Sequence, residues 1–251
     1  MIRRFAYKGA NFSIRSDGYD VIVSEIIRQR RILSEYIKRL PSFLSSLVPV
    51  HPLEDAPEIA LRMHAAADMT GVGPMAAVAG TTAQMAAEAA LAAGAREAVV
   101  ENGGDIYLAS SRQIIIGLYA GNNPLSGKLG FAVSSDDMPL AICSSSSRMG
   151  HSLSLGDCDL ACVVSADAAL ADAAATLAAN LVTRPADIDS ALECVSGIKG
   201  IKGVLIVKDD RVGMVGTLPE LVRHNDPAFY DKITRYGKNQ KKTAYIYDKS
   251  L

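Results

Sequence analysis

An acid and a hydroxyl, Asp172 and Thr176, stand four positions apart in an alanine-rich segment that spans residues 168 to 183. Residues four apart on a helix lie on one face, one turn above each other. A carboxylate among alanines is costly to bury unless it is paired or bound to a cation. A carboxylate and a hydroxyl, completed by backbone carbonyls and phosphate oxygens, suit Mg²⁺. The spacing therefore predicts a magnesium site; alternatively, Asp172 is a cap-like anion near the helix start, with Asp167 as the cap itself.

A loop with two glycines, Gly71 and Gly73, is a second segment that could hold a ligand. Glycines let backbone N–H groups approach an anion, and the helix start that follows favours negative charge. The loop lacks the lysine of a Walker A loop and the spacing of GxGxxG. It predicts either a phosphate site or a tight connection that lets two elements pack closely.

Two further glycines, Gly103 and Gly104, lie between two predicted strands. The Asn-Gly pair is a strong signal for a hairpin turn. Asn102 also carries an amide that can read a polar ring edge, and Glu101 and Asp105 flank the glycines. We interpret Asn102, Gly103, Gly104 and Asp105 as a ligand-facing turn.

A run of four serines follows Cys143: Ser144, Ser145, Ser146 and Ser147. With Arg148 and His151 they supply phosphate donors without needing net charge. The alternative is a flexible polar loop. A serine hydrolase would need a Gly-x-Ser-x-Gly elbow, which the sequence lacks. A zinc site from Cys143, His151, Cys158 and Cys162 has no usual ligand spacing.

Taken in order, these segments resemble the signatures of the ApbE-like superfamily. The matching pieces are TGVGPMA, ENGGDI, SSSS and LADAAAT, within about residues 65 to 182. The resemblance implies a T-fold type α+β architecture, with a mixed or antiparallel sheet and two alanine-rich core helices. It also implies a dinucleotide between the small-residue loops. Within the superfamily, the chain most resembles a compact branch that is shorter than the FAD:protein FMN transferases.

The resemblance also implies roles for single residues. In the transferases, FAD is split at its pyrophosphate and FMN is attached to a threonine of a target protein. By position, Asp172 and Thr176 match the Mg²⁺ ligands, with the carbonyl of Ala76 as a third. The flavin-side turn is matched by Asn102, Gly103, Gly104 and Asp105. The serine run, with Arg148, matches a segment that lines the same cleft. His151 is the catalytic candidate, because it is the counterpart of a transferase His-x-x-Asp-Pro element.

The sequence departs from the transferases at two places. Ala77 falls where the transferase loop carries a lysine, and residues 151 to 154 read His-Ser-Leu-Ser, without Asp-Pro. Phosphoryl transfer depends mostly on positioning and charge neutralisation. A retained Mg²⁺ site could therefore still bind a dinucleotide while the acceptor side has changed.

We therefore expect Mg²⁺-dependent binding of a flavin, FAD or FMN, or of another dinucleotide or phosphate ligand. A protein acceptor belongs to this hypothesis if the chain is a flavin transferase. The alternative is a non-catalytic accessory or carrier protein in sulfur or redox metabolism, because relatives of this branch occur in connection with sulfide assimilation and homocysteine formation. Reactivity of Cys143 toward persulfide would favour that alternative. A structural subunit of a homo-oligomer is a third hypothesis.

The elements that must position these residues come in blocks. Alternating apolar residues over 3 to 23 predict a β-hairpin, and helical periodicity over 24 to 47 predicts a helix that is broken or kinked at Pro41. Other predicted helices span 57 to 67, 75 to 93, 168 to 183 and 189 to 197. Predicted strands span 97 to 101, 105 to 109, 113 to 118, 130 to 134, 139 to 143 and 160 to 165, before a hairpin at 203 to 215.

This order predicts a segregated α+β protein rather than alternating βαβ units. We expect one ApbE-like domain over residues 1 to 223 and a peripheral arm over 224 to 251. The two alanine-rich helices hint at a duplicated unit.

Composition and charge limit the classes of partner that the chain is expected to bind. The chain is 49% hydrophobic, and its 26 basic and 27 acidic residues leave a net charge of −1. No long-range field would gather nucleic acid or an anionic membrane. No apolar run reaches signal-peptide length at the N-terminus or the roughly 18 residues of a membrane span, so we expect a cytoplasmic protein. Cys143, Cys158, Cys162 and Cys194 form no CxxC pair, which favours packed, reduced thiols.

Overall fold

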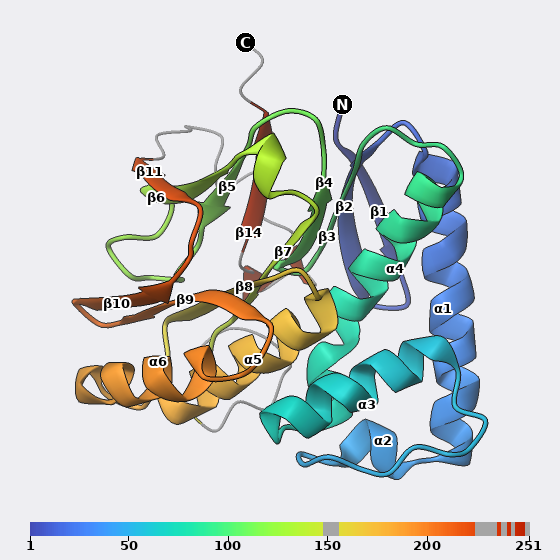
Figure 1. The fold of residues 1–251 in the computed structure, drawn as a ribbon, viewed down its shortest axis with the longest axis horizontal. Helices are drawn as coiled ribbons and strands as arrows, with labels where there is room; N and C mark the ends of the chain where they lie inside the picture. Colours follow the sequence, from blue (N-terminus) through green and yellow to red (C-terminus); the bar gives the residue numbers. More distant parts are fainter. Residues whose placement is uncertain (148–155, 224–234, 237–239, 242–243, 249–251) are drawn as a thin grey trace.

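Two antiparallel sheets and a layer of helices build the fold (Figure 1). It was obtained as a computed structural model, which describes residues 1–147, 156–223, 235–236, 240–241 and 244–248. The helices cover one face of the larger sheet, and the smaller sheet covers its other face. The larger sheet therefore lies between two apolar layers.

The larger sheet is entirely antiparallel and has eight strands in the described part of the chain. In spatial order they are β1 (Arg3–Tyr7), β2 (Ala10–Ser16), β3 (Ala98–Asn102), β4 (Asp105–Ala109), β7 (Leu140–Ser145), β8 (Leu160–Ser165), β9 (Ile201–Lys208) and β10 (Arg211–Gly216). The smaller sheet runs in the order β11 (Glu220–Arg223), β6 (Leu129–Val133), β5 (Ile114–Leu118) and β14 (Ala244–Asp248). A short pair, β12 (Arg235–Tyr236) and β13 (Gln240–Lys241), forms a separate two-stranded sheet, and β12 lies close to β2.

The helices gather on one face of the larger sheet. They are α1 (Tyr19–Arg39), α2 (Ser42–Ser45), α3 (Glu58–Thr70), α4 (Val78–Ala92), α5 (Ala168–Leu181) and α6 (Ile188–Ser196). Short 3₁₀ turns are η1 (Pro74–Ala77), η2 (Ser135–Asp137) and η3 (Pro185–Asp187). None of the helices in the described ranges is long and apolar enough to cross a membrane.

The central strands of the larger sheet, β3, β4, β7 and β8, are apolar on both faces. On β3, Val100 faces the helices and Val99 faces the smaller sheet. On β4, Tyr107 faces the helices and Leu108 faces the smaller sheet. Successive side chains of a strand point to opposite faces, and a sheet covered on both sides needs apolar residues on each. This explains why these segments are near-continuous apolar runs, with an abrupt change to polar residues where the strands end.

The topology contains the duplication that the sequence hints at. Two pairs of strands with helices between them occur twice. In the first unit β1-β2 and β3-β4 enclose α1 and α4, with α2 and α3 inserted between these two helices; in the second unit β7-β8 and β9-β10 enclose α5 and α6. Within each unit the first helix packs toward the first strand pair and the second helix toward the second pair. The alanine-rich helices α4 and α5 are therefore not counterparts: α4 is the second helix of one unit and α5 is the first helix of the next. They are rich in alanine because they meet at the junction of the units, where both are packed on most sides.

Most predicted elements agree with the structure, and two predictions need correction. The hairpin is confirmed for β1 and β2, but residues 19 to 23 open helix α1 instead of continuing the strand. Residues 20 to 23 read Asp-Val-Ile-Val, a short β-branched run that is typical of a strand, but packing of Ile22 and Ile26 in the core selects the helix. The second correction concerns the cysteines: the prediction of packed thiols is wrong for Cys194, which is exposed because it lies on the solvent side of α6.

The C-terminal segment contributes one strand to the smaller sheet. β14 pairs antiparallel with β5, with Ile246 opposite Ile116. The division of the chain into one domain and a peripheral arm stays a prediction. The pairing of β14 with β5 attaches the C-terminal segment to the smaller sheet.

A buried histidine joins three helical elements. His64 of α3 is 2% exposed, and its Nε2 lies 2.9 Å from the hydroxyl of Tyr36 in α1. That hydroxyl accepts a hydrogen bond from the Leu53 N–H at 3.2 Å, and the ring of Phe43 packs against the imidazole. The Tyr36 hydroxyl thus links the imidazole of His64 to the backbone at Leu53. Burial lowers the pKa of His64, because the charged form loses its hydration.

Because the pKa of His64 is lowered, we expect the protein to lose stability in acid. The pKa of His64 is lower in the folded than in the unfolded chain, where it is about 6.5. The neutral ring therefore stabilises the fold fully above about pH 6.5, and this contribution is lost as pH falls, at up to about 1.4 kcal/mol per unit of pKa difference. We expect the free energy of unfolding, measured in urea between pH 7.5 and 5, to fall less steeply in His64→Leu. His51→Gln, at an exposed histidine whose charge is the smallest cause of the lowered His64 pKa, should change the slope far less than His64→Leu; a wild-type slope in His64→Leu would contradict the assignment.

Candidate functional site

The carboxylate of Asp172 binds the first turn of a neighbouring helix. Its Oδ2 accepts hydrogen bonds from the N–H groups of Ala79, at 3.0 Å, and Gly80, at 2.8 Å. Asp172 is 7% exposed. The first N–H groups of a helix have no partner within the helix and attract negative charge. Asp172 of α5 therefore caps α4 across the junction of the two units.

In the second contact between these helices, the side chain comes from α4 and the backbone N–H from α5. Gln84 of α4 accepts a hydrogen bond from the Ala168 N–H, at the start of α5, with its Oε1 at 2.7 Å. Between the two contacts, a Cβ atom at Gly80 would lie 2.3 Å from the Ala168 carbonyl oxygen. Each helix thus supplies a side chain to the first turn of the other, and the glycine gives them room to do so.

The start of α5 has its own cap. The Asp167 side chain accepts from the N–H groups of Ala169, at 2.8 Å, and Leu170, at 3.2 Å. The prediction that Asp167 caps this helix is confirmed. The alternative to a metal site was that Asp172 is an anion near the start of its own helix. In the structure Asp172 does act on a helix start, but on the start of α4.

The turn between β3 and β4 contacts the same end of α4. Asn102 donates through Nδ2 to the Ala79 carbonyl at 3.3 Å. Gly103 and Gly104 have φ values of 66° and 112°, which side chains rarely adopt, and the Gly104 N–H donates to Glu101 Oε1 at 2.9 Å. The turn is therefore fixed by its own glycines and acid, and its amide side chain faces the helix start.

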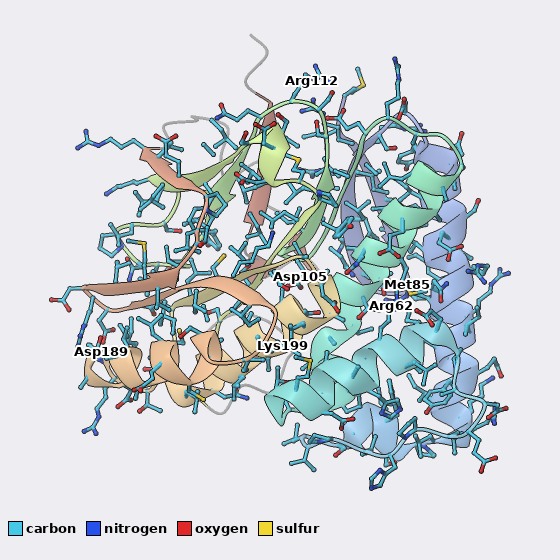
Figure 2. The ribbon with its side chains drawn as sticks, viewed as in Figure 1. Arg62, Met85, Asp105, Arg112, Asp189 and Lys199 are labelled. Carbon is cyan, nitrogen blue, oxygen red and sulfur yellow. The ribbon has the colours of Figure 1, made fainter. Side chains whose placement is uncertain are left out.

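The end of β7 completes this group. Ser144 donates through its hydroxyl to the Gly104 carbonyl at 2.9 Å, and its N–H donates to Asp105 Oδ1 at 3.2 Å. Figure 2 labels Asp105 where the sheet meets the starts of α4 and α5. Three predicted segments are thereby brought together around the first turn of α4, through Asn102, Gly104, Asp105, Ser144 and Asp172.

Two of the remaining serines hold backbone groups. Ser146 donates to the Cys158 carbonyl at 3.3 Å, and Ser147 donates to the Ala179 carbonyl at 3.1 Å. These bonds join the end of β7 to the segment before β8 and to the last turns of α5. Ser145 is half-buried at the end of β7, and Arg148 and His151 lie outside the described residues. Contact of the serine run with a ligand stays a prediction.

The glycines of the first loop have structural roles. Gly71, with φ of 76°, ends α3 in the left-handed conformation, and its N–H donates to the Ala67 carbonyl at 2.7 Å. A Cβ atom at Gly73 would lie 1.9 Å from the Ser46 carbonyl oxygen. The tight connection proposed as an alternative is thus present; a phosphate contact at Gly71 or Gly73 stays a prediction.

The predicted magnesium ligands lie on neighbouring elements. Thr176 follows Asp172 by one turn of α5 and is half-buried, and Ala76 lies in η1, which packs against α5. Among the residues that the structure describes, no three His, Cys, Asp or Glu side chains gather so that they could hold a metal ion. The predicted set is of another kind: one carboxylate, one hydroxyl and one backbone carbonyl.

Two residues of the α4–α5 contact were missed by the sequence analysis. Gly80 is a costly glycine inside an alanine-rich helix, and Gln84 is one of the few polar residues on the same face, four positions later. These features are a signal for a close helix contact, although they do not identify the partner helix.

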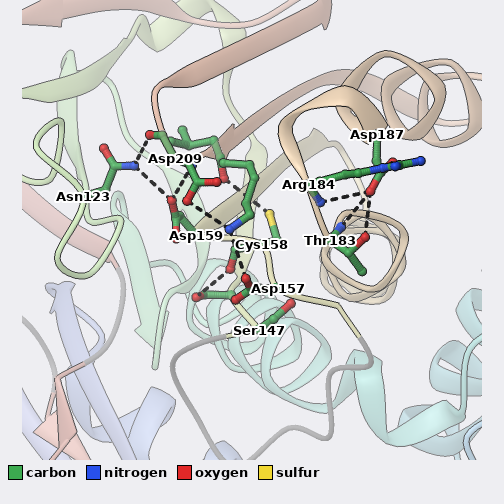
Figure 3. Close-up of polar contacts among 12 residues, drawn as sticks. Asn123, Ser147, Asp157, Cys158, Asp159, Thr183, Arg184, Asp187 and Asp209 are labelled. Atoms are coloured by element: carbon green, nitrogen blue, oxygen red, sulfur yellow. Dashed lines mark hydrogen bonds and ion pairs between the residues drawn. The ribbon is translucent and has the colours of Figure 1, made fainter.

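A buried lysine forms a second polar cluster that the sequence analysis also missed (Figure 3). Lys208 is 3% exposed, and its Nζ lies 3.0 Å from Asp157 Oδ2 and 3.0 Å from Asp209 Oδ1. Asn123, from the connection between β5 and β6, donates to Asp159 Oδ2 at 3.0 Å and to the Asp209 carbonyl at 2.7 Å. These contacts tie the connection to the β9–β10 turn, and the paired charges give the cluster a structural role.

Cys143 lies beneath the candidate site as a neutral thiol. It is fully buried, and its Sγ lies 3.6 Å from the Ala168 carbonyl oxygen. Burial, followed by the nearby carboxylates of Asp105 and Asp172, raises the pKa of Cys143 well above its usual value. A thiolate is the reactive form of cysteine. The environment therefore counts against Cys143 as a sulfur carrier.

The arrangement of sheets and helices has a clear likeness among solved structures. It is similar to the flavin transferase ApbE from Vibrio cholerae, with a TM-score of 0.53 and 12% identity, over 86% of this chain and 96% of that one. It is also similar to the apo form of the flavinyl transferase ApbE from Pseudomonas stutzeri, with a TM-score of 0.51 and 13% identity, over 88% and 95%. At these identities the likeness shows the fold, and it confirms the ApbE-like α+β architecture.

Sequence comparison identifies the family. The family model described as AbpE bacteria matches residues 11–196, so the chain belongs to this family. A UPF0280 protein of Methanocella arvoryzae is 41% identical over 241 residues, which cover 92% of this chain and 97% of that protein. A UPF0280 protein of Methanocaldococcus jannaschii is 40% identical over 230 residues, covering 88% and 93%. The relatives match nearly end to end, so the resemblance extends well beyond the four short segments.

The close approach at Gly80 gives a prediction about stability. Gly80→Ala would raise helix propensity by about 1 kcal/mol, but its methyl group would meet the Ala168 carbonyl at 2.3 Å. We expect a net destabilisation of roughly 1–3 kcal/mol, because packed helices must separate. Urea unfolding measures it. Gly197→Ala, where the added atom meets neighbours only at ordinary distances of 3.4 and 3.6 Å, is the control; equal stability of the two variants would disprove the close contact.

The cysteine environments give a second prediction. Burial also raises the pKa of Cys158 and of Cys162 to about 12, whereas Cys194 is exposed. In the native protein at pH 8, only Cys194 should react rapidly with Ellman's reagent, and Cys194→Ser should remove the rapid phase. Rapid labelling of Cys143 in that variant, located by peptide mass spectrometry, would instead revive the carrier hypothesis.

Proposed function

We propose that the chain binds a flavin nucleotide, with FAD as the leading ligand, together with Mg²⁺. The observation that carries the proposal is the meeting of Asp172, the Asn102–Asp105 turn and Ser144 around the first turn of α4. These residues come from segments far apart in the chain, and they are the ones that match the flavin transferase signatures. The fold likeness to two flavin transferases supports the same ligand class.

The donor chemistry fits a hard cation. Carboxylate, hydroxyl and backbone carbonyl, from Asp172, Thr176 and Ala76, are oxygen ligands of the type that Mg²⁺ shares with substrate phosphates. Two backbone N–H groups hold Asp172 Oδ2 in place, so the carboxylate is oriented before any ion binds. When bound, Mg²⁺ would neutralise the charge of the phosphates.

The surrounding residues have separate tasks in this proposal. Asn102 would orient the flavin side through its amide, and the glycines after it leave the turn without side chains that would obstruct a planar ring. The polar end of β7 would lie beside the phosphates. Transfer of FMN to a protein threonine is the finer proposal, and it also requires an acceptor side to which His151 belongs.

The proposal is tested with purified protein, FAD and Mg²⁺. We expect quenching of flavin fluorescence on binding, with a dependence on Mg²⁺; release of FMN and AMP, separated by chromatography, would extend the result to pyrophosphate cleavage. Absence of binding to FAD and to related dinucleotides, with and without Mg²⁺, would overturn the proposed function.

The role of Asp172 is tested by Asp172→Asn. The amide oxygen can still accept from the N–H groups of Ala79 and Gly80, so the fold should be kept while the negative charge is lost. We expect Mg²⁺-dependent binding to weaken by at least about tenfold. Asp167→Asn makes the same change at the helix cap and should leave Mg²⁺ binding unchanged. Equal affinities of the two variants would exclude Asp172 as a ligand.

A further inference from the structure

A chain of side-chain contacts runs from the surface of α3 to the start of α5. Arg62 of α3 donates through Nε to Glu58 Oε1 and through Nη1 to Glu88 Oε2, each at 2.8 Å. Glu88 of α4 accepts at its other oxygen, Oε1, from Gln84 Nε2 at 2.8 Å. Gln84 then accepts from the Ala168 N–H. Figure 2 shows Arg62 where α3 passes α4.

The contacts of Gln84 and Asp172 are paired by helical spacing. Gly80 and Gln84 lie one turn apart on one face of α4, and Ala168 and Asp172 lie one turn apart on one face of α5. Gly80 meets Asp172, and Gln84 meets Ala168. The two bonds therefore fix how far α5 is shifted along α4, and a slide of either helix would break both.

We propose that Gln84 is the positioning residue of the candidate site: by holding the Ala168 N–H, it keeps the carboxylate of Asp172 on the first turn of α4. Gln84 itself is one turn further along α4, and its hydrogen bonds go to Ala168 and Glu88. Its importance for metal binding rests on the proposed function, but its effect on Asp172 does not.

The amide of Gln84 is matched to both neighbours. Its oxygen accepts from a backbone N–H, while its nitrogen donates to the Glu88 carboxylate. Glutamate at position 84 would keep the acceptor but would place a second negative charge one turn from Glu88. Methionine, of similar length, would remove both the acceptor and the donor. The two substitutions therefore separate the contact with α5 from the contact within α4.

The direct readout is amide hydrogen exchange at Ala79 and Gly80, measured by NMR. Their N–H groups bond to Asp172 and not to Gln84, so a change there reports the position of the carboxylate. We expect Gln84→Met to accelerate exchange at both amides by at least about tenfold relative to amides of β8, and Gln84→Glu to restore most of the protection. The effect should be local, because the strands do not depend on this contact.

A matched control exists on another helix. Gln29 of α1 donates to Glu25 Oε1 at 2.7 Å, one turn away, so Gln29→Met removes a similar Gln–Glu contact outside the site. It should leave exchange at Ala79 and Gly80 unchanged. Affinity for Mn²⁺, measured by electron paramagnetic resonance as a probe of the oxygen site, should fall at least about fivefold in Gln84→Met and not in Gln29→Met.

The outcomes separate the two proposals. Faster exchange at Ala79 and Gly80 in Gln84→Met, with rescue by glutamate, supports the positioning role even if the wild type binds no Mn²⁺, and in that case only the proposed function fails. Exchange at these amides equal to that in Gln29→Met would overturn the positioning role, whatever the metal affinity. Exchange in Gln84→Glu as fast as in Gln84→Met would also overturn the positioning role. Glutamate keeps an acceptor for the Ala168 N–H, so this contact would then not be what protects the two amides.

Discussion

The approach of α4 and α5 at Gly80 is the contact on which the candidate site depends. A side chain at this position would overlap the Ala168 carbonyl, and without close approach neither Asp172 nor Gln84 could reach the other helix. Each bond satisfies a backbone N–H that the helix itself cannot satisfy. The same geometry thus stabilises two helix starts and places a carboxylate beside the turn that carries Asn102.

The duplicated topology explains why this contact lies in the middle of the molecule. α4 ends the helical part of one unit and α5 begins that of the next, so their first turns meet over the central strands β4 and β7. Alanines allow the helices to pack against each other and against the sheet at short distances. The polar residues of the site then come from the ends of those strands, where the apolar pattern stops.

Capping and metal binding are compatible roles for Asp172. One carboxylate oxygen, Oδ2, accepts both backbone N–H groups. A carboxylate has several acceptor positions, so orientation by a helix start and binding of a cation do not exclude each other. The buried, neutral thiol of Cys143 beside this group counts against sulfur transfer.

The sequence by itself determined most of the element types, the α+β class and the four segments that carry polar chemistry, because strand and helix periodicities and glycine turns are local properties. It also indicated Asp172 and Thr176 as one helical face. Only the tertiary structure decided that α1 starts at Tyr19, that Cys194 faces solvent, and that Asp172 caps α4 while Gln84 holds α5. These facts depend on which surfaces meet across many residues, and a local pattern contains no information about the partner that a side chain will find.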